Sequence, residues 1–219
     1  MKNLLLLLLF SHSIYSQDIA FVPQVKDWGT YLPSLTTIYN YPYTNFLPLN
    51  LNNRNDLILA WIVNENDDNL ELINNWMTAN SHQSITAGTN DALVCSFAED
   101  GTLNWATYLG GEKEELKASV VLDADDNIYI VGTTKSNTGI ATAGAFQTEH
   151  TNYHLPPAYV DMGGISIEVV PAKLLSNYFI SKFNSEGNML WSTYFSGDKG
   201  SELYNFKPFI GKYRNLHFW

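Results

Sequence analysis

The sequence predicts an all-β fold of short antiparallel strands joined by tight turns. In residues 103–109, Leu, Trp, Thr and Leu alternate with Asn, Ala and Tyr, so the two sets of side chains fall on opposite faces of a strand. Residues 97–111 and 183–197 match at an offset of 86 residues, sharing Phe, Gly, Trp, Thr, Tyr and a final Gly. Repeated units of four short strands are typical of β-propeller blades. The predicted fold class is therefore a partial, incomplete β-propeller of four-stranded antiparallel blades.

The first 16 residues have the order of a secretory signal peptide. A short positive start, Met1–Asn3, precedes seven consecutive apolar residues, Leu4–Phe10, and a mostly polar segment that ends at Ser16. The apolar run is far shorter than the roughly 20 residues needed to span a bilayer. We expect cleavage after Ser16 and a mature chain that is secreted or held at the cell surface.

The mature chain divides into three repeats. Residues 17–90 predict a degenerate first blade with an insertion, in which Trp28-Gly-Thr-Tyr is the weak counterpart of the later Trp-x-Thr-Tyr motifs. Residues 91–176 predict a second repeat with an insertion at about 150–175. Residues 177–219 predict the start of a third, truncated repeat. A remainder of the same polypeptide is expected to complete the propeller.

The second repeat shows its strands most clearly. Four β-prone runs are separated by polar turns that contain Gly, Asp or Asn, and we assign them to one blade. These runs are 93–97, 103–109, 118–122 and 128–131. Tyr178–Phe183 and Met189–Phe195 repeat the first two of them. The only helical periodicity that we find lies at Asn69–Thr78, which predicts one short helix inside the first insertion.

Three motifs carry a resemblance to a known family. They are Phe-x3-Gly-x3-Trp-x-Thr-Tyr-x-x-Gly from Phe97, Asp-x3-Asn-x-Tyr-x-x-Gly-Thr-Thr from Asp123, and Gly144-Ala-Phe-Gln. In this order they resemble the SBBP β-propeller repeats. The resemblance implies that this chain is part of a long exported bacterial surface protein. The resemblance covers residues 84–219 well and 27–83 poorly. Pro33–Asn53 has no counterpart, and Ser196 replaces the first Gly of a Gly-Gly pair.

Charge and cysteine content exclude several function classes. The 219 residues carry 12 basic and 22 acidic side chains, a formal net charge of −10, and no basic cluster. Phosphate neutralisation has no basic patch to use, so no nucleic-acid partner is expected. A single cysteine, Cys95, provides neither an internal disulfide nor a zinc site, and we expect it to be a buried small hydrophobe. No cofactor and no membrane span are predicted.

Metal-ligand spacing occurs twice, and we interpret both cases as structural. Asp123, Asp125 and Asn127 match the first three oxygen positions of a calcium loop, but the Gly and Glu that such a loop needs later are missing. An acidic turn between strands is the favoured interpretation, and these three residues stay weak metal candidates. His150 and His154 are four residues apart, but the two prolines that follow argue against a helical zinc site.

Aromatic residues supply the candidate binding side chains. Trp28, Trp105 and Trp191 occupy equivalent repeat positions and are expected to pack between blades. Tyr39, Tyr41 and Tyr43 fall outside the repeat pattern, so they are the weak candidates for binding, with a role in the core equally open.

Two functions remain open from the sequence. The first is a non-catalytic scaffold at the cell surface that binds a protein or glycan partner through the loops of the propeller. The alternative is a fragment of a propeller enzyme, quinoprotein-like or glycan-degrading, whose catalytic residues lie outside this chain. No nucleophile elbow and no catalytic acid–base set is visible, which favours the scaffold.

Overall fold

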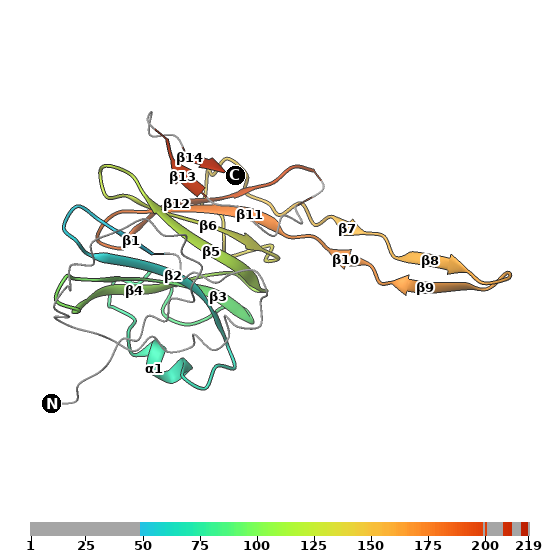
Figure 1. The fold of residues 1–219 in the computed structure, drawn as a ribbon, viewed down its shortest axis with the longest axis horizontal. Coiled ribbons are helices and arrows are strands. Elements are labelled where there is room, and N and C mark those ends of the chain that lie inside the picture. Colours follow the sequence, from blue (N-terminus) through green and yellow to red (C-terminus); the bar gives the residue numbers. More distant parts are fainter. Residues whose placement is uncertain (1–48, 199, 201–207, 212–215, 219) are drawn as a thin grey trace, which may run out of the picture.

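Two four-stranded antiparallel sheets make up most of the molecule (Figure 1). The structure is a computed structural model, and it describes residues 49–198, 200, 208–211 and 216–218. The first sheet pairs its strands in sequence order: β1 (Leu49–Leu51), β2 (Leu57–Asn64), β3 (Asn90–Phe97) and β4 (Leu103–Leu109). The second sheet does the same with β5 (Glu115–Leu122), β6 (Ile128–Thr134), β11 (Asn177–Phe183) and β12 (Met189–Phe195). Each sheet is therefore a simple meander.

Insertions enter both sheets between their second and third strands. The first sheet receives the short helix α1 (Leu70–Asn74), and the second receives a long ribbon that projects from the body (Figure 1). We call this ribbon the arm; it consists of β7 (His154–Leu155), β8 (Ala158–Asp161), β9 (Ser166–Val170) and β10 (Lys173–Leu174). A last antiparallel hairpin, β13 (Pro208–Ile210) with β14 (Leu216–Phe218), follows the second sheet, and β13 contacts β5.

The sequence repeat is a repeat in strand register. Ala92 faces Leu109 across β3 and β4, and the matching pair in β11 and β12 is Tyr178 with Phe195. The register shifts by one residue immediately before Phe97 in the first pair, and immediately before Phe183 in the second. A bulge at the same position in both hairpins bends both strands in the same way. The two sheets are therefore two copies of one unit.

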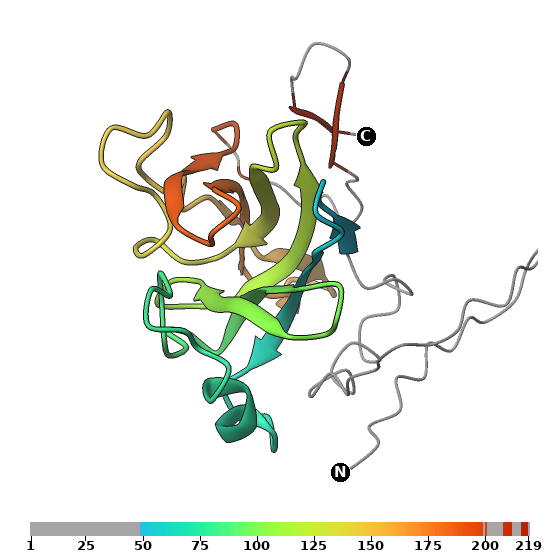
Figure 2. The ribbon, with the colours of Figure 1, turned by 90° about the vertical axis from the view of Figure 1, so that its left-hand side faces the viewer.

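The main core lies between the two sheets. We call the two surfaces that meet there the inner faces. The inner face of the first sheet comprises Ile58, Ala60, Ala92, Val94, Trp105 and Leu109, and that of the second comprises Ala118, Val120, Ile128, Ile130, Phe179, Phe183 and Tyr194. A second core lies on the outer face of the first sheet, where α1 and the residues after it cover Leu59, Trp61, Leu93, Cys95, Phe97 and Tyr108 (Figure 2). Burial of these apolar surfaces is the main force that holds the layers together.

Strand positions agree with the sequence prediction, and the helix is shorter than expected. The all-β class is confirmed, and α1 covers five residues of the predicted 69–78. The grouping into one blade of the strands at 93–97, 103–109, 118–122 and 128–131 was wrong. The first two belong to the first sheet and the last two to the second. Gly110 and Gly111 end β4, and the chain crosses there to the next layer instead of folding back onto the same sheet.

The described residues form a stacked pair of sheets, the arm and an extra hairpin, without closing into a ring. Within the same residues, no helix has the length and apolar content to cross a membrane.

Candidate functional site

Four short turns of one geometry gather at one end of the two sheets. We call this the turn end; it comprises residues 52–56, 98–102, 123–127 and 184–188. In each turn the first backbone N–H donates to the carbonyl of the fifth residue, over 2.8–3.1 Å. The fourth residue has positive φ in every case: Asn55, Gly101, Asp126 and Gly187. Asn, Asp and Gly are the residues that tolerate this conformation best, which explains the recurring turn composition.

The predicted acidic turn at Asp123 is held together by its own hydrogen bonds. One carboxylate oxygen of Asp123 accepts from the backbone N–H groups of Asp125 and Asn127, at 3.0 and 2.9 Å. The other accepts from the Asn127 side-chain amide at 2.8 Å and the Tyr129 hydroxyl at 3.1 Å. Burial opposes ionisation of Asp123, but these donors outweigh it and hold its pKa below the usual value. Its oxygens are thus occupied by donors within the protein.

The turn at residues 52–56 repeats this network with the amide and the acid exchanged. Asn52 stands at the first position, and its oxygen accepts from the N–H groups of Arg54 and Asp56 at 2.9 and 2.8 Å. Its amide nitrogen donates to the Asp56 carboxylate at 2.8 Å. The same turn therefore forms without an acid at the first position, which favours the structural interpretation of Asp123. Among the described residues, no cluster of three or more His, Cys, Asp or Glu could hold a metal ion.

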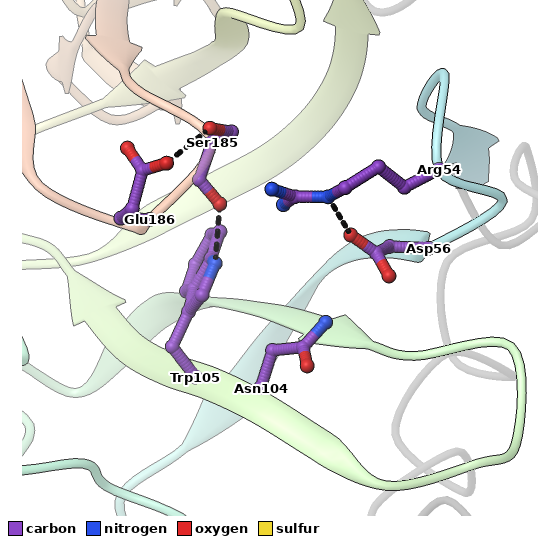
Figure 3. A pocket seen from close by; sticks show the side chains of 6 residues that line it. All are labelled: Arg54, Asp56, Asn104, Trp105, Ser185 and Glu186. Atoms are coloured by element: carbon purple, nitrogen blue, oxygen red, sulfur yellow. Dashed lines mark hydrogen bonds and ion pairs between the residues drawn. The ribbon is translucent and has the colours of Figure 1, made fainter.

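An open cleft of about 330 Å³ lies at the turn end, where the two sheets meet (Figure 3). The lining residues come from two turns and the start of strand β4: Arg54, Asp56, Asn104, Trp105, Ser185 and Glu186. Hydrogen bonds tie the neighbouring turns of the two sheets together, since the Asn53 backbone N–H donates to the Asp126 carboxylate at 3.0 Å. The cleft thus sits on a braced junction between two copies of the repeat.

Trp105 forms the floor of the cleft and is used for packing. Its indole N–H donates to the Ser185 backbone carbonyl at 3.0 Å, and its ring stacks on Phe183 with centroids 6.5 Å apart. A Cβ on Gly187 would lie 2.5 Å from the indole, so only glycine lets the turn approach this closely. The side chain is 6% exposed, so it offers no open face for stacking a sugar ring.

Polar groups of mixed charge form the walls of the cleft. The guanidinium of Arg54 pairs with Asp56 at 3.0 Å, and its far end points across the cleft in Figure 3. Burial opposes the ionisation of Asp56, but donors from Asn52 and Arg54 outweigh it and lower its pKa. Glu186 accepts from the Ser185 hydroxyl at 2.7 Å on the opposite side. Such walls suit a polar ligand with several hydroxyl or amide groups.

A buried pair of carboxyl groups lies at the other end of the sheets. Asp91 and Glu115 are both fully buried. A Cβ on Gly110 would lie 2.4 Å from an Asp91 oxygen and 2.3 Å from a Glu115 oxygen. The two acids are therefore within about 5 Å of each other, close enough to disfavour ionisation of both.

Donors from three segments satisfy this pair: residues 83–88, Gly111 and residues 134–136. Asp91 accepts from the Gln83 side chain at 2.8 Å and the Ala87 N–H at 2.7 Å, and Glu115 accepts from Thr134 at 2.6 Å and Ser136 at 2.8 Å. Burial raises the pKa of Asp91. Burial also raises the pKa of Glu115, to about 8, and the nearby charge of Asp91 acts in the same direction. Together they outweigh the hydrogen-bond donors, which lower this pKa. Perturbed acids often mark catalytic sites, but this pair is enclosed and out of reach of a substrate.

One glutamine braces each sheet, and sequence reasoning missed the one in the first sheet, Gln83. The backbone carbonyl of Gln83 accepts from the Tyr108 N–H, and its side-chain oxygen accepts from the Gly110 N–H. Gln147 makes the same two bonds with Tyr194 and Ser196. The Gly-Ala-Phe-Gln motif that ends at Gln147 therefore has a structural counterpart that ends at Gln83. The two segments share only the glutamine. Its hydrogen bonds, rather than its neighbours in sequence, reveal the match.

The remaining predicted residues have mixed outcomes. Cys95 is fully buried, as expected, and burial raises the pKa of its thiol. His150 is buried at the base of the arm, where it contacts the Thr134 carbonyl at 3.3 Å, whereas His154 is exposed and bonds to the Asn152 carbonyl. The signal peptide, Trp28 and the binding candidates Tyr39, Tyr41 and Tyr43 lie outside the described residues.

No protein-family model matches the chain, and no curated protein matches it significantly.

Proposed function

We propose that this chain is an exported β-propeller repeat module that acts as a non-catalytic scaffold, binding a protein or glycan partner at the cell surface. The observation that carries the proposal is the repetition of a packing face. The outer face of the second sheet comprises Tyr129, Val131, Tyr178, Ile180, Trp191 and Phe195. Through the strand registers, these residues occupy the positions of Ile58, Ala60, Ala92, Val94, Trp105 and Leu109.

The repeated face is more exposed than its original along the edge strand β12, whereas Val131 and Ile180 in its central strands are buried. Trp105 is 6% exposed and Leu109 fully buried, whereas Trp191 is 38% and Phe195 44% exposed. A surface built like the inner face of the first sheet has the pattern needed to receive another sheet of the same kind. The β13–β14 hairpin supports this, because β13 contacts β5, the first strand of the second sheet, as β5 contacts β1, the first strand of the first sheet. Repetition of this step is how propeller blades stack around an axis.

The turn end is the proposed binding surface. Its turns are short, of one geometry and braced across the two sheets, so side chains on them are held in fixed positions. The cleft between Arg54 and Glu186 offers a cation, an acid and an amide within one open space. A rigid, polar, concave surface of this kind fits recognition of hydroxyl-rich or peptide ligands better than chemistry on them.

The test is a binding screen of the full-length mature protein on a glycan array and against purified cell-surface proteins. Arg54→Ala and Glu186→Ala are expected to weaken a detected interaction about tenfold or more, because each removes a charged group from the cleft wall. Lys135→Ala is the matched control, since Lys135 pairs with Glu114 away from the cleft. Turnover of a small substrate, together with no binding to any polymer, would overturn the proposal and favour the propeller enzyme.

A further inference from the structure

The arm is an apolar surface without a cover. All residues from Ala158 to Lys173 are exposed. Seven large apolar or aromatic side chains among them are between 44% and 67% exposed: Tyr159, Val160, Met162, Ile165, Ile167, Val169 and Val170. Soluble proteins rarely leave such a concentration of apolar side chains in water unless it contacts a partner.

The register of the ribbon separates an apolar face from a polar one. Val160 pairs with Ile167, and Ala158 pairs with Val170. The alternate pairs are Tyr159 with Glu168 and Asp161 with Ser166. Residues that face each other across two strands share one face of the ribbon, so the first set forms an apolar stripe and the second a polar one. Sheets with this alternation are built to bury one side.

The base of the arm is anchored to the second sheet. The Thr151 hydroxyl donates to the Asn177 side chain at 2.8 Å, and the Leu175 N–H donates to the Tyr153 carbonyl at 2.9 Å. His150 is buried there and packs edge-on against Tyr194, with ring centroids 5.9 Å apart. The arm therefore projects in a defined direction from the body (Figure 1). Such preorganisation lowers the entropic cost of binding.

The edges of the arm are less suited to binding than its apolar face. Pro156 and Pro157 precede β8 and Pro171 follows β9, and proline has no N–H to donate to an added strand. A bulge between Ala158 and Tyr159 twists the ribbon at the same place. Both features discourage strand addition along an edge, so the apolar face is the surface available for docking.

We propose that the arm is a dimerisation element whose apolar face packs against the same face of the arm of a second copy of this chain. A twofold arrangement makes an apolar stripe complementary to itself. The body carries the acidic excess of a chain with net charge −10, whereas Asp161 and Glu168 are the only charges from Pro156 to Ala172. The arm is thus the region where two copies can meet with the least repulsion.

The dimensions of the arm fit this arrangement. From His154 to Met162 the ribbon extends roughly 30 Å at about 3.3 Å per residue. That length exceeds the screening distance of about 8 Å at physiological salt, so the acidic bodies need not approach each other closely. Four apolar side chains per copy, Ala158, Val160, Ile167 and Val170, make up the stripe. The contact is therefore at the small end of specific interfaces, and a dissociation constant in the micromolar range is expected.

The experiment is sedimentation equilibrium on the full-length mature protein and on two variants at adjacent positions of β9. Ile167→Asp places a charge on the apolar face, whereas Ser166→Asp places the same residue on the polar face. The wild type is expected to be a dimer. Ile167→Asp should raise its dissociation constant at least about tenfold, and Ser166→Asp should change it less than about threefold. Equal effects of the two variants, or a wild type that stays monomeric at about 100 µM, would overturn the proposal.

Two further variants separate this inference from the proposed function. Replacement of residues 158–170 by Asn-Gly removes the stripe, and a melting curve that matches the wild type shows that the body is intact. Trp191→Ser instead alters the outer face of the second sheet. Loss of dimers on shortening the arm, but not on changing Trp191, supports dimerisation through the arm. The reverse result assigns association to the outer face and overturns the inference without affecting the proposed scaffold.

Discussion

The two sheets share strand order, register, bulge position and turn geometry, yet they differ in what covers them. The outer face of the first sheet is sealed by the insertion that carries α1. Trp76 from this insertion packs edge-on against Trp61 and Phe97, at centroid distances of 6.4 and 5.7 Å. The insertion of the second sheet instead leaves the body as the arm. Equivalent faces of the repeat unit are therefore covered by an insertion in the first sheet and by the first sheet itself in the second.

The comparison also separates residues that define the unit from residues that adapt to its place. Phe97 and Phe183, at the bulges, are both buried, and so are Tyr108 and Tyr194. Asp91 and Asn177 occupy equivalent positions, but only Asp91 meets a second carboxyl group, in Glu115. The acid pair is thus a property of the junction between the sheets and not of the repeat.

The largest difference is expected between the two equivalent tryptophans. Trp105→Ala should cost about 3–5 kcal/mol of unfolding free energy, because it empties a packed site between the sheets. Trp191→Ala should cost about 1 kcal/mol in this chain, since the side chain is 38% exposed. Urea denaturation of the mature protein measures both. Equal costs would mean that the outer face of the second sheet is already covered.

The two turn glycines should differ by a smaller amount. Gly187→Ala should cost about 2–3 kcal/mol, because positive φ strains alanine and the new methyl group meets the indole of Trp105. Gly144→Ala is the control for backbone strain alone, because its φ is +77° and a Cβ there would meet nothing within 4 Å, and it should cost about 1 kcal/mol. Thermal and urea unfolding check this pair. Identical costs would show that the turn can move away from Trp105.

The buried acid pair should make stability depend on pH above neutrality. The folded-state pKa of Glu115 is raised to about 8, so the folded protein holds a proton that the unfolded chain releases near pH 4.5. Stability from this group is present below pH 4.5 and is lost as the pH rises to about 8. Between pH 7 and 9 the loss should be about 1–2 kcal/mol.

Glu115→Gln should flatten this pH dependence, as measured by urea midpoints at pH 7, 8 and 9. Glu112→Gln is the control, because donors from Asn137 and Thr138 outweigh burial and lower the pKa of Glu112 to about 2, so it stays ionised throughout. A wild-type midpoint that does not fall above pH 7 would contradict a shared proton in the pair.

The smallest effect is expected in the acidic turn. Asp123→Asn should cost less than about 1 kcal/mol, because Asn52 makes the same backbone contacts in the equivalent turn and only the ion pair with Lys182, at 3.7 Å, is lost. Asp123→Ala removes these contacts and should cost about 1–2 kcal/mol. Adding millimolar calcium should leave the melting temperature of the wild type unchanged. A calcium-dependent rise that Asp123→Asn abolishes would restore the metal interpretation.

Much of the local structure could be predicted from the sequence. β4 and β12 have the predicted bounds, and the turn at Gly101 has the expected positive φ. These features depend on the alternation of apolar and polar residues along a strand and on the backbone freedom of single residues. Both can be recognised from residues that are neighbours in sequence. The candidate cleft was not predictable in this way, because Arg54 and Glu186 are more than 130 residues apart in sequence and meet only when the sheets stack. The brace at Gln83 was hidden for the same reason.

The sequence by itself determined the repeat, the strands and the turns, since each depends on interactions between residues that are close along the chain. Only the tertiary structure decided which strands share a sheet, which of two equivalent tryptophans is buried, and where two acids share a buried site. Those outcomes depend on contacts between segments that are distant in sequence. The alternation of residues along a strand determines which side chains share a face of the sheet, but not which segment covers that face. The covered inner face and its partly exposed copy, with Trp105 in one and Trp191 in the other, show that physical difference most directly.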